Sequence, residues 1–338
     1  MLKFSSIAPF HNNLFFNKHM QTEKFDYQKF IAKLVSFAPR QFENEKKTAD
    51  FLVSFLEKNS VFYAIQEFET EIPLTKKVLL MADKKQIDCE GCSFVSGEIK
   101  SNDIIISSLL SSSICQDISN INYNPKCSGI SLNNYYFAPA ICVSREKIAL
   151  VIKAKKIFGE VVVERKKFKS KNILVGNLKN PQTISFAHYD SIKKGAIDNA
   201  SGVALLMKSL LEKPEILENS LFVFSGNEEL SYDKPIYWGR GFRAFEKKYF
   251  SILNKTKKII IVDCVGNAPV TVIADLAVAK LAFPILNLNK IGKKVEIVTA
   301  DLDDLMQVYH SDLDDGKKII KKYFDEAFFA FVKKIKTK

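Results

Sequence analysis

Continuous apolar runs of strand length dominate the second half of the chain. Between them, apolar residues recur every three or four positions, which is the spacing of a helix with one buried face. Runs that are apolar throughout suit strands buried on both faces of a sheet. These runs are NILVGNL, TISFA, LFVFS, KIIIVDC and KVEIVTA, at 172–178, 183–187, 221–225, 258–264 and 294–300.

Helical spacing is predicted at 201–213, at about 241–254 and in the terminal segment 319–335. The segment 26–58 carries two further helical stretches, separated by the polar break APRQFENE, and a strand is expected at 61–70. Alternation of strands and helices predicts an α/β fold, with a mixed, mostly parallel central sheet sandwiched by helices.

The pattern changes between residues 73 and 165, where short β-like runs are split by Ser, Asn, Gly and Pro. The stretch SNINYNPKCSGISLNNYY is especially dense in turn-forming residues. We therefore expect a small, mainly β domain at 73–165, inserted into a catalytic domain formed by residues 1–72 and 166–338.

The chain has 338 residues, of which 47% are hydrophobic and 26% are charged. This is the composition of a globular protein. The chain has no run of eighteen apolar residues, so we expect no membrane span. The start, MLKFSSIAPFHNNLFFNKHMQTEKF, lacks the apolar segment and cleavage site of a signal peptide. We expect a cytoplasmic protein, with Met20 as an alternative start and residues 1–19 poorly ordered.

The formal net charge is +12, but the lysines are scattered as pairs and are not gathered into one stripe with interleaved aromatic residues. This pattern favours a lysine-rich surface over a nucleic-acid partner, and it leaves a modest preference for acidic substrates open.

Six cysteines are present, and the two-residue gap between Cys89 and Cys92 suits a zinc knuckle or a redox pair. A second closely spaced pair is missing, because Cys115 and Cys127 lie too far apart to supply one. Free, reduced thiols are favoured. A redox pair, or a metal site that also uses Cys115 and Cys127, remains a minor alternative.

Acidic and histidine side chains follow four of the apolar runs, and in open α/β sheets that edge is where sites are built. One aspartate, Asp198, lies just before the helix that follows the first of these runs. The residues that follow the runs are His188 and Asp190 after TISFA, Glu228 and Glu229 after LFVFSGN, Asp263 after KIIIV, and His310 after the short run QVY.

Imidazole and carboxylate groups without thiolate suit zinc or a neighbouring divalent ion. There are more candidate ligands than one catalytic zinc needs, but the number suits two metals that share a bridging carboxylate. Glu228 is then free to take and return a proton, and Asp190 is placed to orient His188. The candidate ligands are His188, Asp198, Glu229, Asp263 and His310.

The motifs AHYDS, GAIDNASGVA, NEEL, IVDCVG and YHSDLDD, in this order, resemble those of the M28 family of dinuclear zinc exopeptidases. The resemblance covers 171–315 and extends loosely to the N-terminal helices. It implies the zinc-exopeptidase fold, and the insert lies where many members carry a protease-associated or lid-like domain.

The resemblance also implies roles for single residues. His188 and Asp263 would bind one zinc ion, Glu229 and His310 the other, and Asp198 would bridge the two. Glu228 would be the general base that takes a proton from the attacking water and later gives it to the leaving amine, while Asp190 orients His188. Tyr309 is either an oxyanion donor or a packing aromatic. Cobalt or manganese in place of zinc remains open.

The chain departs from the family pattern after the two glutamates, where LSYDKPIYWGRGFRAFE replaces a short Gly-rich turn. Trp238, together with Tyr237 and Phe242, either lines a substrate pocket or packs in the interior. Arg240 and Arg243 either pair with a substrate carboxylate or have a structural or solvated role.

The leading hypothesis is a metallo-aminopeptidase that hydrolyses N-terminal residues of peptides. A carboxypeptidase, a deacylase or a single-zinc glutaminyl cyclase on the same fold remains an alternative, as does a non-catalytic peptide-binding homologue. The sequence does not determine the oligomeric state, the side-chain preference or whether the insert gates the site.

Overall fold

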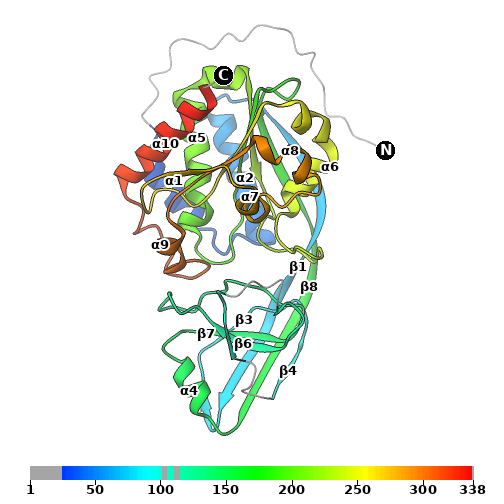
Figure 1. Ribbon diagram of the computed structural model, residues 1–338, viewed down its shortest axis with the longest axis vertical. Helices are drawn as coiled ribbons and strands as arrows, with labels where there is room; N and C mark the ends of the chain where they lie inside the picture. Colours follow the sequence, from blue (N-terminus) through cyan, green and yellow to red (C-terminus); the bar gives the residue numbers. More distant parts are fainter. Residues whose placement is uncertain (1–24, 101–104, 110–114, 337–338) are drawn as a thin grey trace.

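The computed structural model describes residues 25–100, 105–109 and 115–336. These residues form a larger α/β unit and a smaller unit, which are joined by two long strands (Figure 1). The expectation that residues 1–19 are poorly ordered lies outside the described residues. None of the described helices is both long and apolar enough to cross a membrane.

A mixed sheet forms the centre of the larger unit. Its middle strands β9, β10, β11 and β13 are parallel, whereas β8, β1 and β12 run antiparallel to their neighbours. The spatial order is β12 (Thr271–Ile273), β13 (Val295–Thr299), β11 (Lys258–Val262), β9 (Thr183–His188), β10 (Ser220–Ser225), β8 (Ile157–Gly176), β1 (Tyr63–Ala82) and β2 (Lys85–Gln86), with β4 (Gly97–Ile99) paired to β8.

Helices cover both faces of this sheet, which confirms the predicted α/β class. The side chains of β10 show why, because Phe222 and Phe224 enter the core on one face and Leu221 and Val223 the core on the other. On the first face lie α1 (Tyr27–Val35), α2 (Glu43–Lys58), α5 (Gly202–Glu212) and α10 (Lys321–Lys336); on the second lie α6 (Arg240–Lys255), α7 (Leu276–Ala282) and α8 (Leu288–Ile291).

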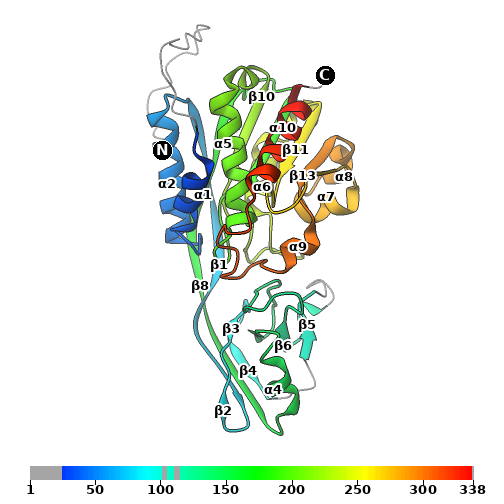
Figure 2. The same cartoon turned by 90° about the vertical axis from the view of Figure 1, so that its left-hand side faces the viewer.

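Strands β1 and β8 link the two units as one antiparallel pair, from Tyr63 opposite Val175 to Ala82 opposite Ile157. The strand expected at 61–70 therefore continues to residue 82. The run GEVVVE at 159–164, in the expected insert, and the run NILVG at 172–176 belong to one strand. The pair has one register shift, between Thr75 and Lys77. It passes the expected domain boundaries at 73 and 165 without a break (Figure 2).

The smaller unit packs a second sheet against the far half of this strand pair. Its core joins Leu80 of β1 and Val161 of β8 to Ile121 and Ile141 of the second sheet. The second sheet has the order β3 (Glu90–Gly91), β7 (Ala140–Val143), β6 (Asn120–Tyr123) and β5 (Ile105–Ser107), with helix α4 (Ile148–Lys153) beside it.

The cysteines of this insert are free thiols, and burial raises the pKa of Cys92 to about 12. A thiol with so high a pKa stays protonated at neutral pH and is a poor nucleophile. Within the described ranges, neither Cys89 nor Cys92 belongs to a group of closely spaced metal-ligating side chains.

Candidate active site

The five predicted ligands come together at the edge of the larger unit that faces the insert. Strand β8 leaves the insert and enters the sheet, and β10 runs antiparallel to it, so β10 and its parallel neighbours end on the side of the insert (Figures 1 and 2). His188 is the last residue of β9, Asp263 follows β11 directly, and Glu229 lies shortly after β10. Asp198 lies in a turn at Ala196–Ser201 that leads into α5.

Asp198 faces both histidines. Its Oδ1 lies 3.1 Å from His188 Nε2, and its Oδ2 lies 3.2 Å from His310 Nε2. His188 Nε2 is also 3.5 Å from an oxygen of Asp263, and His310 Nε2 is 2.9 Å from an oxygen of Glu229. The set therefore forms two neighbouring clusters that share one carboxylate.

These clusters contain more hydrogen-bond acceptors than donors. His310 Nδ1 lies 3.1 Å from the carbonyl oxygen of Leu132, which is an acceptor, so Nδ1 carries the proton and a neutral ring has its lone pair on Nε2. The buried Oε1 of Glu229 has no hydrogen-bond partner among the described residues. Buried carboxylates and imidazole nitrogens that converge in this way fit a divalent metal ion.

The pKa values of His310 and Glu229 also indicate that the clusters favour positive charge. Burial lowers the pKa of His310, but Glu229 and Asp198 outweigh this effect and raise that pKa to about 10. Burial raises the pKa of Glu229 to about 7. Without a cation the cluster therefore holds protons in its place, because unpaired carboxylates are costly in the interior.

Glu228 lies beside the clusters, and its carboxylate takes no part in the contacts above. Burial raises its pKa well above the usual range, His188 opposes this shift, and the charge of Glu229 adds to it. A carboxyl group with a raised pKa can accept a proton and return it near neutral pH.

Asp190 is fully buried and ties the ends of two strands together. Its carboxylate accepts the backbone N–H groups of Glu228 and Glu229, at 2.9 and 3.0 Å, and lies 3.5 Å from Nδ1 of His188. It is thus placed to orient the two glutamates as well as the histidine, a contact to the backbone that the sequence does not reveal.

Arg40 is a residue of the site region that sequence reasoning missed. Its fully buried guanidinium donates to the carbonyl oxygens of Tyr189, Lys194 and Gly195, at 2.6, 2.9 and 2.8 Å. It therefore links both ends of the loop between His188 and Asp198 through hydrogen bonds to the main chain. Arg40 lies in the polar break APRQFENE, and its position in the sequence gives no sign of this distant role.

Asp314 was also missed, although it lies within the quoted motif YHSDLDD. Its carboxylate accepts the backbone N–H groups of Ile197 and Asp198, at 2.8 and 3.1 Å. Burial raises the pKa of Asp314 to about 7. Asp314 thus holds the turn that presents Asp198 to both histidines.

The two candidate substrate-binding arginines are held by Asp233. An amino nitrogen of Arg243 lies 3.0 Å from this carboxylate and a nitrogen of Arg240 lies 3.4 Å from it. Arg243 also donates to the carbonyl oxygen of Trp238 at 2.6 Å, and Arg240 to that of Glu69 at 2.9 Å. Both side chains therefore support the loop after the glutamates.

The aromatic residues of this loop have different surroundings. Phe242 is buried and packs edge-on against Phe186, so it belongs to the core. Trp238 is partly exposed, packs against Tyr237 and donates its indole N–H to the carbonyl oxygen of Leu281 at 2.9 Å.

Tyr309 stacks its ring on that of His310, with ring centroids 3.7 Å apart. The prediction that a short strand, QVY, precedes His310 is wrong: the helix α9 (Leu302–Met306) and a following turn lie there. A run of three residues is too short to distinguish a strand from a turn, and here the backbone N–H groups of Val308 and Tyr309 both donate to the carbonyl oxygen of Leu305. Burial and the charges of Asp198 and Glu229 raise the pKa of Tyr309, which keeps its hydroxyl protonated.

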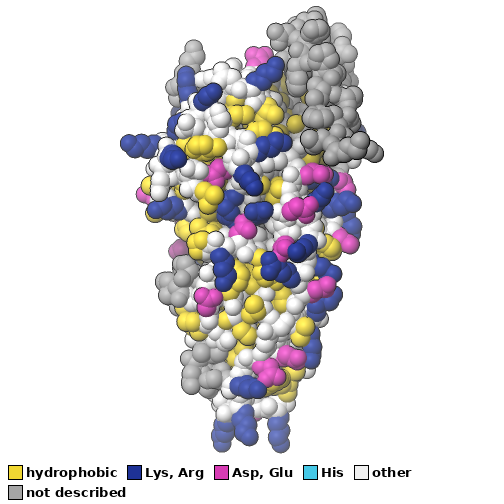
Figure 3. All heavy atoms as spheres, turned by 90° about the vertical axis from the view of Figure 1, so that its right-hand side faces the viewer, with side chains coloured by type: hydrophobic (Ala, Val, Ile, Leu, Met, Phe, Trp, Pro, Cys, Tyr) yellow, Lys and Arg dark blue, Asp and Glu magenta, His cyan; other side chains and the backbone are white. Residues whose placement is uncertain are grey.

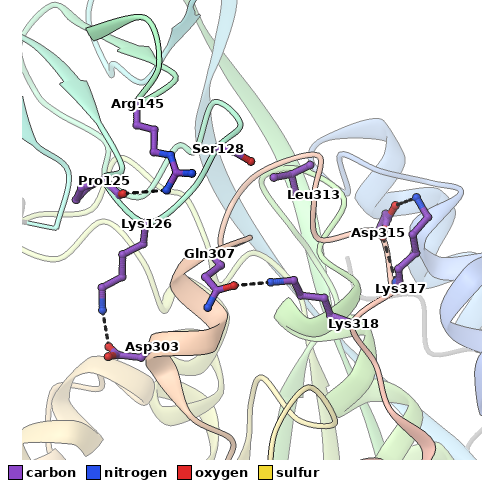
Figure 4. A pocket seen from close by; sticks show the side chains of 10 residues that line it. All are labelled: Pro125, Lys126, Ser128, Arg145, Asp303, Gln307, Leu313, Asp315, Lys317 and Lys318. Atoms are coloured by element: carbon purple, nitrogen blue, oxygen red, sulfur yellow. Dashed lines mark hydrogen bonds and ion pairs between the residues drawn. The ribbon is translucent and has the colours of Figure 1, made fainter. Parts of the chain in front are cut away.

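A cleft of about 810 Å³ lies between the insert and the larger unit (Figure 4). Lys126 and Arg145 line it from the insert, and Lys318 lines it from the other side. Lys126 bridges to Asp303 of α9 at 2.6 Å. The cleft includes none of the five candidate ligands.

Lysine and arginine side chains are interspersed with acidic ones on the face of the molecule shown in Figure 3. This face carries no single basic stripe. That the protein binds no nucleic acid stays a prediction.

The model of peptidase family M28 matches residues 172–273, which confirms the predicted relationship. Similar solved structures include a zinc aminopeptidase from Bacillus subtilis, with a TM-score of 0.63, 18% identity and coverage of 91% of this chain and 93% of that chain. For an aminopeptidase from Aneurinibacillus sp. strain AM-1 the TM-score is 0.57 and the identity 15%, with coverage of 89% of this chain and 91% of that chain. For a glutaminyl cyclase from Tannerella forsythia the TM-score is 0.51 and the identity 14%, with coverage of 92% of this chain and 97% of that chain. No curated protein matches the chain by sequence.

We predict that Arg40→Met lowers the free energy of unfolding of the metal-free protein by about 3 to 5 kcal/mol, because it leaves buried carbonyl groups without donors. Urea denaturation followed by circular dichroism measures this loss. The matched control is Arg145→Met, whose exposed guanidinium makes one long contact to a carbonyl oxygen and should leave the midpoint unchanged. Equal midpoints for Arg40→Met and the wild type would contradict the role of Arg40.

Proposed function

We propose that this chain, whose residues 172–273 belong to peptidase family M28, is a zinc-dependent aminopeptidase that removes N-terminal residues from peptides. One observation carries the proposal: three carboxylates and two imidazoles converge, with Asp198 facing both histidines, and all of them except the partly exposed Asp263 are buried. The fold likeness to aminopeptidases supports it.

In this proposal His188 and Asp263 would hold one zinc ion, Glu229 and His310 would hold a second, and Asp198 would be shared by both. The bound ions would lower the pKa of a water molecule and polarise the carbonyl group of the scissile bond.

The residues of the chain then move the protons. Glu228 accepts a proton from the attacking water and gives it to the nitrogen of the leaving amine as the peptide bond breaks. Asp190 keeps Glu228 in place by accepting its backbone N–H group. The hydroxyl of Tyr309, protonated at neutral pH, donates a hydrogen bond to the developing oxyanion.

The charges favour a free N-terminus as the group that is bound. Two zinc ions bring four positive charges, against the five negative charges of Asp190, Asp198, Glu228, Glu229 and Asp263 when all are ionised. The sum of minus one attracts a substrate ammonium group. A carboxypeptidase needs a cation for the C-terminal carboxylate, and Arg240 and Arg243 are both engaged with Asp233.

Glutaminyl cyclase activity is the second candidate, because the fold likeness extends to the enzyme from Tannerella forsythia. A single-zinc enzyme of that kind needs one metal position. Here His188 and Asp263, 3.5 Å apart, offer a second position, and this favours the aminopeptidase.

Zinc loading followed by removal of excess metal should leave two zinc ions per chain in elemental analysis. Asp198→Ala should retain at most one, because both positions lose a ligand. Asp275→Ala, which changes the exposed N-cap of α7, is the matched control and should retain two. A wild-type protein that takes up no zinc would refute the metal site.

Glu228→Gln should keep both zinc ions and lower kcat by about 100- to 10,000-fold, because the amide cannot accept the proton from water. Zinc content and peptide hydrolysis are measured on the same preparation. Glu218→Gln, an exposed glutamate, is the control and should retain full activity. Full turnover in Glu228→Gln would place the base elsewhere.

A panel of matched peptides distinguishes the candidate reactions. The zinc-loaded enzyme should shorten peptides with a free N-terminus, whether or not the C-terminus is amidated, and should spare their N-acetylated forms. Mass spectrometry of the products reads the result. Shortening of N-acetylated peptides at the C-terminus would indicate a carboxypeptidase. Loss of ammonia from an N-terminal glutamine without shortening would indicate a glutaminyl cyclase.

A further inference from the structure

The insert contacts the candidate ligand His310 directly, through the backbone of Leu132. The N–H group of Leu132 donates to the carbonyl oxygen of His310 at 3.0 Å, and the carbonyl oxygen of Leu132 lies 3.1 Å from Nδ1 of the same histidine. One residue of the insert therefore holds both the backbone and the ring of His310.

Two neighbouring side chains of the insert hold the segment that leads to His310. The hydroxyl of Ser131 donates to the carbonyl oxygen of Tyr309 at 2.7 Å. The amide of Asn124 donates to the carbonyl oxygen of Met306, the last residue of α9, at 2.9 Å. The insert thus donates hydrogen bonds to three backbone carbonyl groups between the end of α9 and the histidine.

His310 needs such support more than His188 does. The backbone of His310 has a φ of +47°, in the left-handed region that residues other than glycine seldom adopt. No strand holds it, whereas His188 is the last residue of β9 and is paired with β10. One half of the site is therefore built by the central sheet, and the other half depends partly on the insert.

The insert is anchored at this position by further contacts. Its Phe94 packs against Tyr237 of the loop after the glutamates, and the hydroxyl of Tyr237 accepts the N–H group of Tyr135 at 3.0 Å. Lys193 bridges Glu90 of the insert, at 2.7 Å, and Asp312 near the site, at 3.0 Å. These contacts hold Leu132 against His310.

We propose that the inserted domain is a positioning element of the metal site. The carbonyl group of Leu132 keeps the proton of His310 on Nδ1 and leaves Nε2 for the metal, and Ser131 and Asn124 hold the turn in place. Docking of the insert therefore sets the affinity of the position formed by Glu229 and His310. The position formed by His188 and Asp263 does not depend on it. This inference rests on the proposed zinc site.

The first test is Ser131→Ala, which removes the hydrogen bond to the carbonyl of Tyr309. Zinc affinities are measured by competition with a chromophoric chelator, without any activity assay. One of the two ions should bind about 10- to 100-fold more weakly, and the other should be unchanged. Asn124→Ala, a second variant, should have the same effect. Circular dichroism and thermal melting establish that each variant is folded.

Ser93→Ala is the matched control. The hydroxyl of Ser93 lies 2.7 Å from the carbonyl oxygens of both Val95 and Ala138 within the insert, so its loss weakens the insert without touching the His310 turn. It should leave both zinc affinities at their wild-type values.

A double-mutant cycle assigns the weakened position. In a His188→Ala background, Ser131→Ala should weaken the remaining zinc ion. In a His310→Ala background, Ser131→Ala should change nothing. Wild-type affinities for both ions in Ser131→Ala and Asn124→Ala, or an equal loss in Ser93→Ala, would overturn the inference while leaving the proposed function intact. A wild-type chain that binds no zinc would instead overturn the proposed function.

Discussion

Several buried carboxylates lie within a few ångströms of one another in this protein, and the rest of the site is organised around that repulsion. Asp198 is the shared member, with one oxygen directed at His188 and the other at His310. Buried like charges are stable only when positive charge compensates them. Protonated imidazoles supply that charge in the absence of metal, because the neighbouring carboxylates raise the pKa values of both histidines. The zinc ions that we propose would supply it instead.

Such a cluster also needs rigid support, and three buried polar side chains provide it. Asp190 and Asp314 accept backbone N–H groups next to the ligands, and Arg40 donates to carbonyl groups on the loop behind them. Each of these side chains acts on the main chain. They fix the conformation of the loops that carry the candidate ligands, so the ligand side chains converge before any metal binds.

The insert extends this support beyond the central sheet. Strands β1 and β8 run without a break from one unit into the other, so they hold the insert next to the C-terminal ends of the parallel strands. Its loop at Leu132 then meets the turn of His310. In our proposal, the insert thus contributes to the construction of the metal site.

The sequence by itself determined the α/β class, the approximate strands of the central sheet and the polar residues that follow β9, β10 and β11. Apolar periodicity reports burial, and parallel strands end at one edge, so residues such as His188 and Asp263 were predictable together. The support from Arg40 and Leu132 and the turn at His310 were decided only by the tertiary structure. They depend on contacts between segments more than a hundred residues apart, and local sequence patterns carry no record of such contacts.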